Sequence, residues 1–146
     1  MTEIGFYHLT RSTLAQALPQ LLARTVAAGQ RAVVLGSDAA GLEALSTVLW
    51  TQPGWLPHGL VSDGDPDLQP IWLSTVAKPL NGARYLFLID GAEADDVKDY
   101  DRIFDLFDGN NHEAVTAARE RWKRAKDIGH TLAYWQQTES SWQKKA

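Results

Sequence analysis

The chain has 146 residues, of which 45% are hydrophobic, and its 14 Lys and Arg against 18 Asp and Glu give a formal net charge of −4 at pH 7. This length and composition suit a single domain, residues 1–146, with a core large enough to need no metal or disulfide. The absence of cysteine excludes disulfides, zinc–thiolate sites and Cys nucleophiles. Because the sequence has neither a secretory signal pattern nor a long apolar run, we expect a soluble cytoplasmic protein.

An aromatic and β-branched segment at Ile4–Leu9 predicts the first strand. A helix follows, capped by Ser12 or Thr13 and ending at Gly29, in which Pro19 predicts either a kink or the true helix start. Its apolar side chains recur at helical spacing, at Leu14, Leu18, Leu21, Leu22 and Val26.

A second strand and helix come next. The continuous apolar run Arg31–Leu35 is typical of a strand that is buried on both faces of a parallel sheet. Ser37 or Asp38 caps the following helix, which ends near Trp50. Thr51–Pro70, rich in Pro and Gly, predicts a long ordered loop, a kind of segment that is often functional.

Three further strands are expected at Ile71–Ser74, Tyr85–Ile89 and Arg102–Phe107. Together with the helices they predict a three-layer α/β fold around a mainly parallel sheet of about five strands. We expect the tail, Thr131–Ala146, to pack partly back on the domain through Trp135 and Trp142.

The segment Asn111–Gly129 predicts one long helix, capped by Asn110 or Asn111. On a helical wheel Arg119, Lys123 and Lys126 fall within about 60° of one another, with Val115 and Trp122 along the same edge. This pattern fits either a solvated face or a binding face. Small or apolar residues occupy the opposite side, at Ala114, Ala117, Ala118, Ala125 and Ile128.

This helix also changes the charge of the chain. Residues 1–113 carry seven Lys and Arg against 15 Asp and Glu, a net charge of −8, whereas residues 114–146 carry seven against three, a net charge of +4. An acidic body repels the phosphates on which general nucleic-acid binding depends. A local basic patch suits a small acidic ligand better, such as a peptide tail.

The turn at Gly36–Gly41, GSDAAG, has the glycine spacing of a phosphate loop. Leu42 and Glu43 stand where such a loop has Lys and then Ser or Thr, and the Gly-x-Gly opening of a dinucleotide fingerprint is missing. The turn is therefore interpreted as a helix cap, and no nucleotide cofactor is expected.

Catalytic and metal motifs also fail. Asp63, Asp65 and Asp67 have the spacing of a calcium loop, but Leu68 and Ser74 replace its Gly and Glu. The histidines at positions 8, 58, 112 and 130 form no helical pair that would bind zinc. We interpret the acidic run from residue 90 to residue 108 as surface that favours solubility, and expect no metal and no enzymatic activity.

The order of several short motifs resembles the chi subunit family of bacterial DNA polymerase III holoenzyme, and the similarity spans almost the whole chain. The motifs are FYHL at Phe6–Leu9, Ala32–Leu35 after Gly29, LWT at Leu49–Thr51, LPHG at Leu56–Gly59, PIWL at Pro70–Leu73, and ARERWK at Ala118–Lys123 followed by Gly129.

The resemblance implies a Rossmann-like fold without a functional phosphate loop, in a non-catalytic cytoplasmic subunit that reaches the nucleoid through the replisome. Chi subunits bind the acidic C-terminal tail of single-stranded DNA-binding protein, which ends in Pro-Phe. By position, Arg119 would pair with the terminal carboxylate, Trp122 and Val115 would line the Phe pocket, and Lys123 would hold the upstream acidic residues. Lys126 and the C-terminal lysines are further candidates.

The resemblance also implies a second surface, which binds the psi subunit of the clamp loader where the organism has one. By position this surface is formed by Trp50, Trp55, Leu56, Pro57 and His58, with Trp55 standing where the family has Phe. The alternative is that Trp50 and Trp55 close the core under a long loop.

A second functional class remains open for the C-terminal region. Trp122, Trp135 and Trp142 would then stack on the bases of single-stranded DNA, beside the basic face of the long helix. The acidic body of the chain argues against this alternative.

Overall fold

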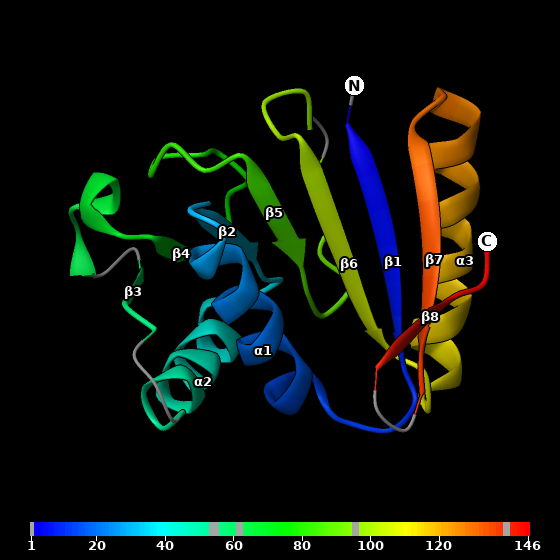
Figure 1. Ribbon diagram of the computed structural model, residues 1–146, viewed down its shortest axis with the longest axis horizontal. Helices are drawn as coiled ribbons and strands as arrows, with labels where there is room; N and C mark the ends of the chain where they lie inside the picture. The colour runs from blue at the N-terminus through cyan, green and yellow to red at the C-terminus, as the bar shows by residue number, and fades with distance from the viewer. Residues whose placement is uncertain (1, 53–55, 61–62, 95–96, 139–140) are drawn as a thin grey trace.

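The computed structural model describes residues 2–52, 56–60, 63–94, 97–138 and 141–146 (Figure 1). These residues form a mixed α/β structure with one eight-stranded sheet in the order β3-β4-β2-β5-β6-β1-β7-β8. All neighbouring strands are parallel except β7 and β8, which are antiparallel. The strands are β1 Glu3–Leu9, β2 Ala32–Leu35, β3 His58–Leu60, β4 Ile71–Ser74, β5 Tyr85–Leu88, β6 Arg102–Asp108, β7 Thr131–Gln137 and β8 Trp142–Lys144.

The prediction of about five strands was therefore too low. The first additional strand, β3, lies within the segment expected to be a loop, which also contains the short 3-10 helix η2 (Pro66–Leu68). The other two, β7 and β8, come from the expected tail, where β7 pairs with β1 along six residues. These strands were missed because β3 and β8 have only three residues each and β7 is defined by its long-range partner.

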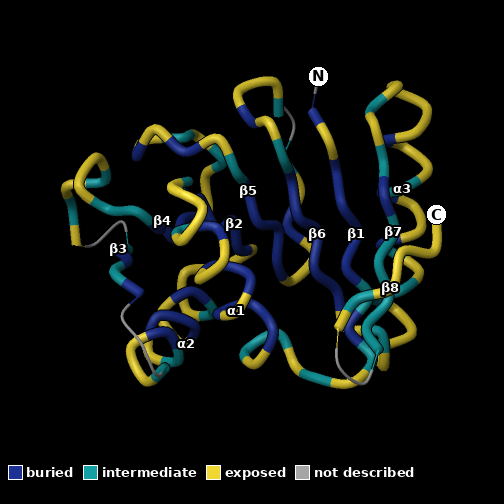
Figure 2. Tube along the Cα trace, in the orientation of Figure 1, coloured by how far each residue is buried: buried dark blue, intermediate teal, exposed yellow. Residues whose placement is uncertain are grey.

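Helices cover both faces of the sheet, as Figure 1 shows. The helices α1 (Leu14–Ala27) and α2 (Ala39–Trp50) pack on one face, and α3 (His112–Ile128) packs on the other. Two hydrophobic cores result, one on each side of the strands, and the buried strand backbone between them is dark blue in Figure 2. Among the described residues, no helix is long and apolar enough to cross a membrane.

The helix ends follow the predicted capping signals. Thr13 and Gln16 form a capping box at the start of α1, so Pro19 lies inside the helix rather than at its start. Asp38 caps α2 by accepting the Gly41 N–H at 2.6 Å. The N-cap of α3 is Asn111, and the helix ends at Gly129, whose φ of 98° is strained for residues with a Cβ atom.

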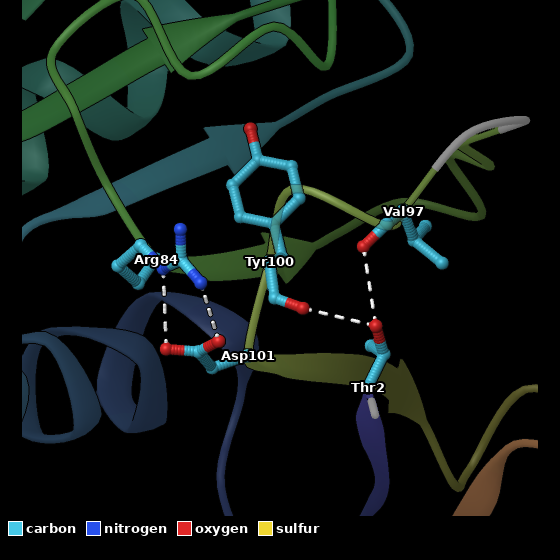
Figure 3. Close-up of polar contacts among 5 residues, drawn as sticks. All are labelled: Thr2, Arg84, Val97, Tyr100 and Asp101. Atoms are coloured by element: carbon cyan, nitrogen blue, oxygen red, sulfur yellow. Dashed lines mark hydrogen bonds and ion pairs between the residues drawn. The ribbon is translucent and has the colours of Figure 1, made fainter.

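Side-chain contacts fasten the amino ends of the central strands (Figure 3). The Thr2 hydroxyl lies 2.9 Å from the Tyr100 carbonyl oxygen and 3.3 Å from that of Val97. Arg84 forms an ion pair with Asp101, with Nη2 2.8 Å from Oδ1, and this hydrogen bonding lowers the pKa of the Asp101 carboxyl. These contacts connect the residues that precede β1, β5 and β6, and they therefore stabilise the fold.

Candidate peptide-binding site

The edge of α3 that faces β7 carries the predicted peptide-binding residues. Ala118 and Ala125 lie against the sheet, so the helix packs closely on it. The helical period places the five predicted residues along the neighbouring edge. Val115 and Trp122 are half-buried there, and the three basic residues are exposed, at Arg119, Lys123 and Lys126. The structure therefore brings all five predicted residues to one side of the helix.

On the opposite side of α3, Ile128 does not pack as expected. Its side chain is 73% exposed, because it lies in the last helical turn, before Gly129 ends the helix. The other residues expected on this side are buried or half-buried.

An aromatic cluster supports the basic edge. The Trp122 ring meets the ring of Phe6 on β1 edge to face at 5.3 Å and the ring of Tyr134 on β7 at 5.9 Å. The Tyr134 hydroxyl lies 2.5 Å from His8 Nδ1, and both side chains pack on Phe107. Because Trp122 is held by rings from two strands, it offers a fixed apolar wall at the surface.

Tyr134 and His8 are site residues that the sequence analysis did not identify. Within β7, TLAYWQQ, alternation sends Leu132 and Tyr134 toward α3, and Ala133 and Trp135 toward the other face. The sequence shows this alternation only if the segment is taken to be a strand. We expected Thr131–Ala146 to be a packed tail, so the alternation was not used.

Arg119 lies close enough to Tyr134 to act on its ionisation. Burial raises the pKa of the Tyr134 phenol, and the positive charge of Arg119 opposes this rise. Among the residues that the structure describes, Arg119 makes no ion pair or hydrogen bond through its guanidinium. Its fork of N–H donors is thus open to solvent beside an aromatic wall, an arrangement suited to a carboxylate next to a ring.

The C-terminus of the chain reaches the same place. The Lys145 N–H donates to the Tyr134 carbonyl oxygen at 2.7 Å, and the Tyr134 N–H donates to the Ala146 carbonyl oxygen at 3.1 Å. These bonds extend the pairing of β7 with β8 by two residues. The backbone of Lys145 therefore lies directly beside a strand residue of the candidate site.

The other long edge of α3 carries a buried ion pair. Arg121 Nε lies 2.7 Å from Asp105 Oδ2, and Nη2 lies 2.9 Å from Oδ1. Both residues are nearly inaccessible, at 8% for Arg121 and 2% for Asp105. Burial raises the pKa of the Asp105 carboxyl, and the two hydrogen bonds from Arg121 oppose that rise. Assigning the whole acidic run to the soluble surface was therefore wrong for Asp105, which lies in the central strand β6.

The second predicted surface is only partly exposed. Trp50 is 58% exposed and its ring lies over that of His58, with 4.2 Å between centroids. Leu56 and His58 are buried and Pro57 is half-buried, while Trp55 lies outside the described residues. Among the described residues of the predicted set, Trp50 is thus the main exposed apolar group.

Hydrogen bonds fix the His58 ring. Its Nδ1 lies 2.8 Å from the Leu56 carbonyl oxygen, which can only accept, so Nδ1 carries a proton. Nε2 lies 2.8 Å from the Ser46 hydroxyl, so both ring nitrogens have a hydrogen-bond partner. The fixed His58 ring therefore supports the Trp50 ring that packs on it.

The three tryptophans of the DNA-stacking alternative do not share a face. Trp122 packs in the core on the α3 side of the sheet. Trp135 and Trp142 pack on Tyr7, with ring centroids 6.3 Å and 5.1 Å away, in the core on the side of α1 and α2. The sheet separates them, so they cannot form one stacking surface beside the basic edge.

The carboxyl ends of β1, β5 and β6 border a cavity of about 480 Å³. The chain leaves β1 toward one face of the sheet and β6 toward the other, which is where α/β folds often bind phosphates. Here Asp90, Asp108 and Glu113 line the cavity. Their negative charges repel phosphate, and the one cationic residue among the described residues of this lining, Arg121, is already paired with Asp105. The turn at Gly36–Gly41 caps α2, with the Asp38 carboxylate accepting the Gly41 N–H.

The described residues also offer no cluster of metal ligands. In the described ranges, no group of three or more His, Asp or Glu side chains is arranged to hold a metal ion. Asp63 instead accepts the Leu60 N–H at 2.9 Å, and Asp65 precedes η2 with a φ of 51°.

Comparison with known proteins identifies the family. The family model for the DNA polymerase III chi subunit, HolC, matches residues 1–133, which include the whole α3 edge. A probable DNA polymerase III subunit chi of Rickettsia prowazekii (strain Madrid E) is 28% identical over 109 residues, covering 71% of this chain and 66% of that protein, slightly less than two thirds. The chain belongs to the DNA polymerase III chi subunit family.

Proposed function

We propose that this protein is a non-catalytic accessory subunit of the DNA polymerase III holoenzyme that binds the acidic C-terminal tail of single-stranded DNA-binding protein. In this role the protein works in the cytoplasm, at the replisome. The observation that carries the proposal is the exposed Arg119 guanidinium beside the fixed rings of Trp122 and Tyr134. Membership of the chi family supports a replication role, and the geometry of α3 supports the choice of ligand.

A peptide ending in Pro-Phe matches this surface in two ways. Its terminal carboxylate accepts charge-assisted hydrogen bonds from Arg119, and its Phe ring packs between Trp122 and Val115. Burying one Phe side chain contributes about 1.5 to 3 kcal/mol. Since a flexible tail must also be ordered, we expect an affinity in the micromolar range, on the order of −8 kcal/mol.

The remaining basic residues act at longer range. Lys123 and Lys126 are exposed on the same edge, and the 33-residue C-terminal region carries a net charge of +4 against −8 for the rest of the chain. The positive edge attracts acidic residues upstream of the Phe, while the acidic body turns away nucleic acid. Binding is therefore expected to weaken as salt concentration rises.

Isothermal titration calorimetry with a tail peptide tests the site. Arg119→Ala should abolish most of the binding, whereas Arg124→Ala should leave it unchanged, because Arg124 is on the other edge of α3 in an ion pair with Glu93. The same peptide with an amidated C-terminus should bind the native protein as weakly as the free-acid peptide binds Arg119→Ala. Equal affinity of the native protein and Arg119→Ala for the free-acid peptide would reject the site.

The link to the clamp loader, through the psi subunit, is the second part of the proposal. Trp50 supports it, as a large exposed ring held on the buried, hydrogen-bonded His58. A rigid exposed aromatic residue is the side chain most often dominant in protein interfaces. Pro57 contributes neighbouring surface, and the buried Leu56 and His58 hold it in place.

Co-purification from the native organism tests this link. Tagged native protein should retain a small psi-like subunit that Trp50→Ala loses. Leu68→Ala is the matched control, because Leu68 is also a large exposed apolar residue but lies on η2. If Trp50→Ala and Leu68→Ala retained the same partners as the native protein, Trp50 would have no role in the link.

A further inference from the structure

Strand β8 forms one edge of the sheet, beside β7, as Figure 1 shows. The Lys145 N–H donates to the Tyr134 carbonyl oxygen at 2.7 Å, so the backbone of Lys145 points toward β7. Along an antiparallel strand, the backbone groups of successive residues point alternately toward one neighbouring strand and away from it. The N–H and C=O groups of Trp142 and Lys144 therefore point away from the sheet.

These outward backbone groups are fixed in position, and the described chain does not cover them. Within the described residues, no hydrogen bond joins the backbone of Trp142 or Lys144 to a group on the outer side of β8. The Trp142 ring packs edge to face on Tyr7, with 5.1 Å between centroids. The Thr138 N–H donates to the Ser141 carbonyl oxygen at 2.8 Å, which closes the hairpin. The outer side of β8 is thus a preformed strand edge, the template that an extended peptide uses when it adds to a sheet.

Two exposed lysines lie at the end of this edge next to Tyr134. Lys144 and Lys145 make no ion pair within the described part of the chain. Alternation along the strand places Lys144 on the same face of the sheet as Trp142, the face that α1 and α2 cover. The edge continues the candidate peptide-binding site, because Lys145 is hydrogen-bonded to Tyr134, whose ring contacts that of Trp122. An acidic peptide therefore meets lysine side chains at β8 as well as on α3.

We infer that the acidic tail peptide of the proposed function adds to the outer edge of β8 as a further strand. The inference rests on that proposed function, since the terminal Phe anchors the peptide at α3. A two-residue turn, Gly129 and His130, joins α3 to β7, so the two elements run in opposite directions and Lys126 lies near the start of β7. A peptide that passes Lys126 and ends between Val115 and Trp122 runs in the direction of β7, and therefore antiparallel to β8.

The register of this added strand follows from the two faces of the sheet. The terminal Phe side chain points toward α3, and the side chains of an extended peptide alternate between the α3 face and the α1 face. The peptide residue that exchanges hydrogen bonds with Lys144 has its side chain on the α1 face, where its carboxylate attracts the Lys144 ammonium. Counted from the C-terminus with Phe as the first residue, this residue has an even number. The second residue is Pro, which has no N–H, so the fourth residue pairs with Lys144.

Isothermal titration calorimetry of the full-length protein with N-methylated peptides tests the pairing. The probe is Ala-Asp-Asp-Asp-Asp-Pro-Phe with a free C-terminus, together with three versions that carry one backbone N-methyl group each, at the third, fourth or fifth residue from the C-terminus. Each N-methyl group removes one donor and leaves every charge in place. Methylation of the fourth residue should weaken binding about fivefold or more, because its N–H donates to the Lys144 carbonyl oxygen. Methylation of the third or fifth residue, whose N–H faces solvent, should change binding less than about twofold.

Two variants and an exchange measurement locate the contact on β8. Lys144→Pro removes the outward N–H, which has no partner in the described chain, and should weaken binding of the unmethylated peptide about fivefold or more. Lys144→Ala keeps this N–H and should weaken binding less than about threefold. In the native protein, hydrogen exchange of the Lys144 amide, followed by ¹H–¹⁵N NMR, should slow about tenfold or more when the peptide binds.

The outcomes separate this inference from the proposed function. Equal affinity of all four peptides, equal weakening by the three N-methyl groups, equal affinity of Lys144→Pro and Lys144→Ala, or an unchanged exchange rate of the Lys144 amide would each overturn the strand pairing. In those cases, loss of binding in Arg119→Ala would still support the proposed function. If the native protein and Arg119→Ala bound the unmethylated peptide equally, the proposed function would be rejected, and the strand pairing with it.

Discussion

Arg119 and Arg121 stand two positions apart in the same helix and end in opposite environments. Arg119 projects into solvent beside Trp122 and Tyr134, without an ion-pair partner among the described residues. Arg121 is buried and forms two hydrogen bonds to Asp105. Two residues turn a helix by about 200°, so one arginine faces a potential ligand and the other faces the sheet.

This contrast shows that residue type does not decide the role of an arginine within a motif. Asp105 lies on the central strand β6, where an unpaired carboxylate would be very unfavourable. Arg121 neutralises it, and the two-point contact opposes rotation of a helix whose other buried contacts are the small Ala118 and Ala125. Arg121 thus stabilises the fold and keeps the orientation of the edge that Arg119 uses.

Arg121→Ala should have the largest effect. It leaves the Asp105 carboxylate buried without a partner, and we expect a loss of about 3 to 5 kcal/mol in the free energy of unfolding. Urea denaturation measures this loss. A double variant, Arg121→Met with Asp105→Leu, should recover most of the stability, because it removes both charges. A loss below about 1 kcal/mol in the single variant would show that the pair is not structurally important.

Trp122→Ala should affect both stability and binding. The change removes ring contacts with Phe6 and Tyr134, and since the side chain is only half-buried we expect a loss of about 1 to 3 kcal/mol in the free energy of unfolding. Tail-peptide affinity should also fall. Trp122→Phe keeps an aromatic ring and should retain most of the stability and most of the tail-peptide affinity. If Trp122→Phe and Trp122→Ala had equal effects on affinity, an aromatic ring at this position would not contribute to binding.

Arg119→Ala should change only binding. Because the side chain is exposed and unpaired within the described chain, the free energy of unfolding should stay within about 0.5 kcal/mol of the native value. Tail-peptide affinity should fall about 10- to 100-fold. Arg119→Lys keeps the charge without the planar fork and should lie between the two. Urea denaturation and calorimetry on the native protein, Arg119→Ala and Arg119→Lys would test whether Arg119, unlike Arg121, affects binding without affecting stability.

Lys126→Ala should have the smallest effect. Lys126 is exposed on the basic edge and, within the described part of the chain, no contact joins its side chain to the aromatic cluster, so we expect it to act through a screened charge. We expect tail-peptide affinity to fall less than about threefold at low salt, with no difference from the native protein at high salt. A larger fall that persists at high salt would place Lys126 in direct contact with the peptide.

Local signals allowed much of this structure to be predicted. The caps Thr13, Asp38 and Asn111 and the end at Gly129 agree with the structure because each depends on neighbouring residues alone. The placement of Arg119, Trp122 and the nearby basic residues on one edge follows directly from the helical period. Most of the candidate site on α3 was therefore accessible from sequence.

Tertiary pairing decided the remainder. The β7 strand exists because its backbone pairs with β1. That pairing brings Tyr134 beside Trp122 and within hydrogen-bond distance of His8. The same pairing puts Trp135 on the opposite face from Trp122, which the one-dimensional sequence does not reveal.

For Arg119 and Arg121 too, the sequence determined one part of the outcome and the tertiary structure the other. The helical period of the sequence predicts that Arg119 and Arg121 point in different directions. Which of them is buried depends on how α3 rotates as it packs on the sheet, and on the carboxylate that strand β6 places beneath it. Burial of a charge is settled by partners distant in the chain, and these become neighbours only when the fold is complete.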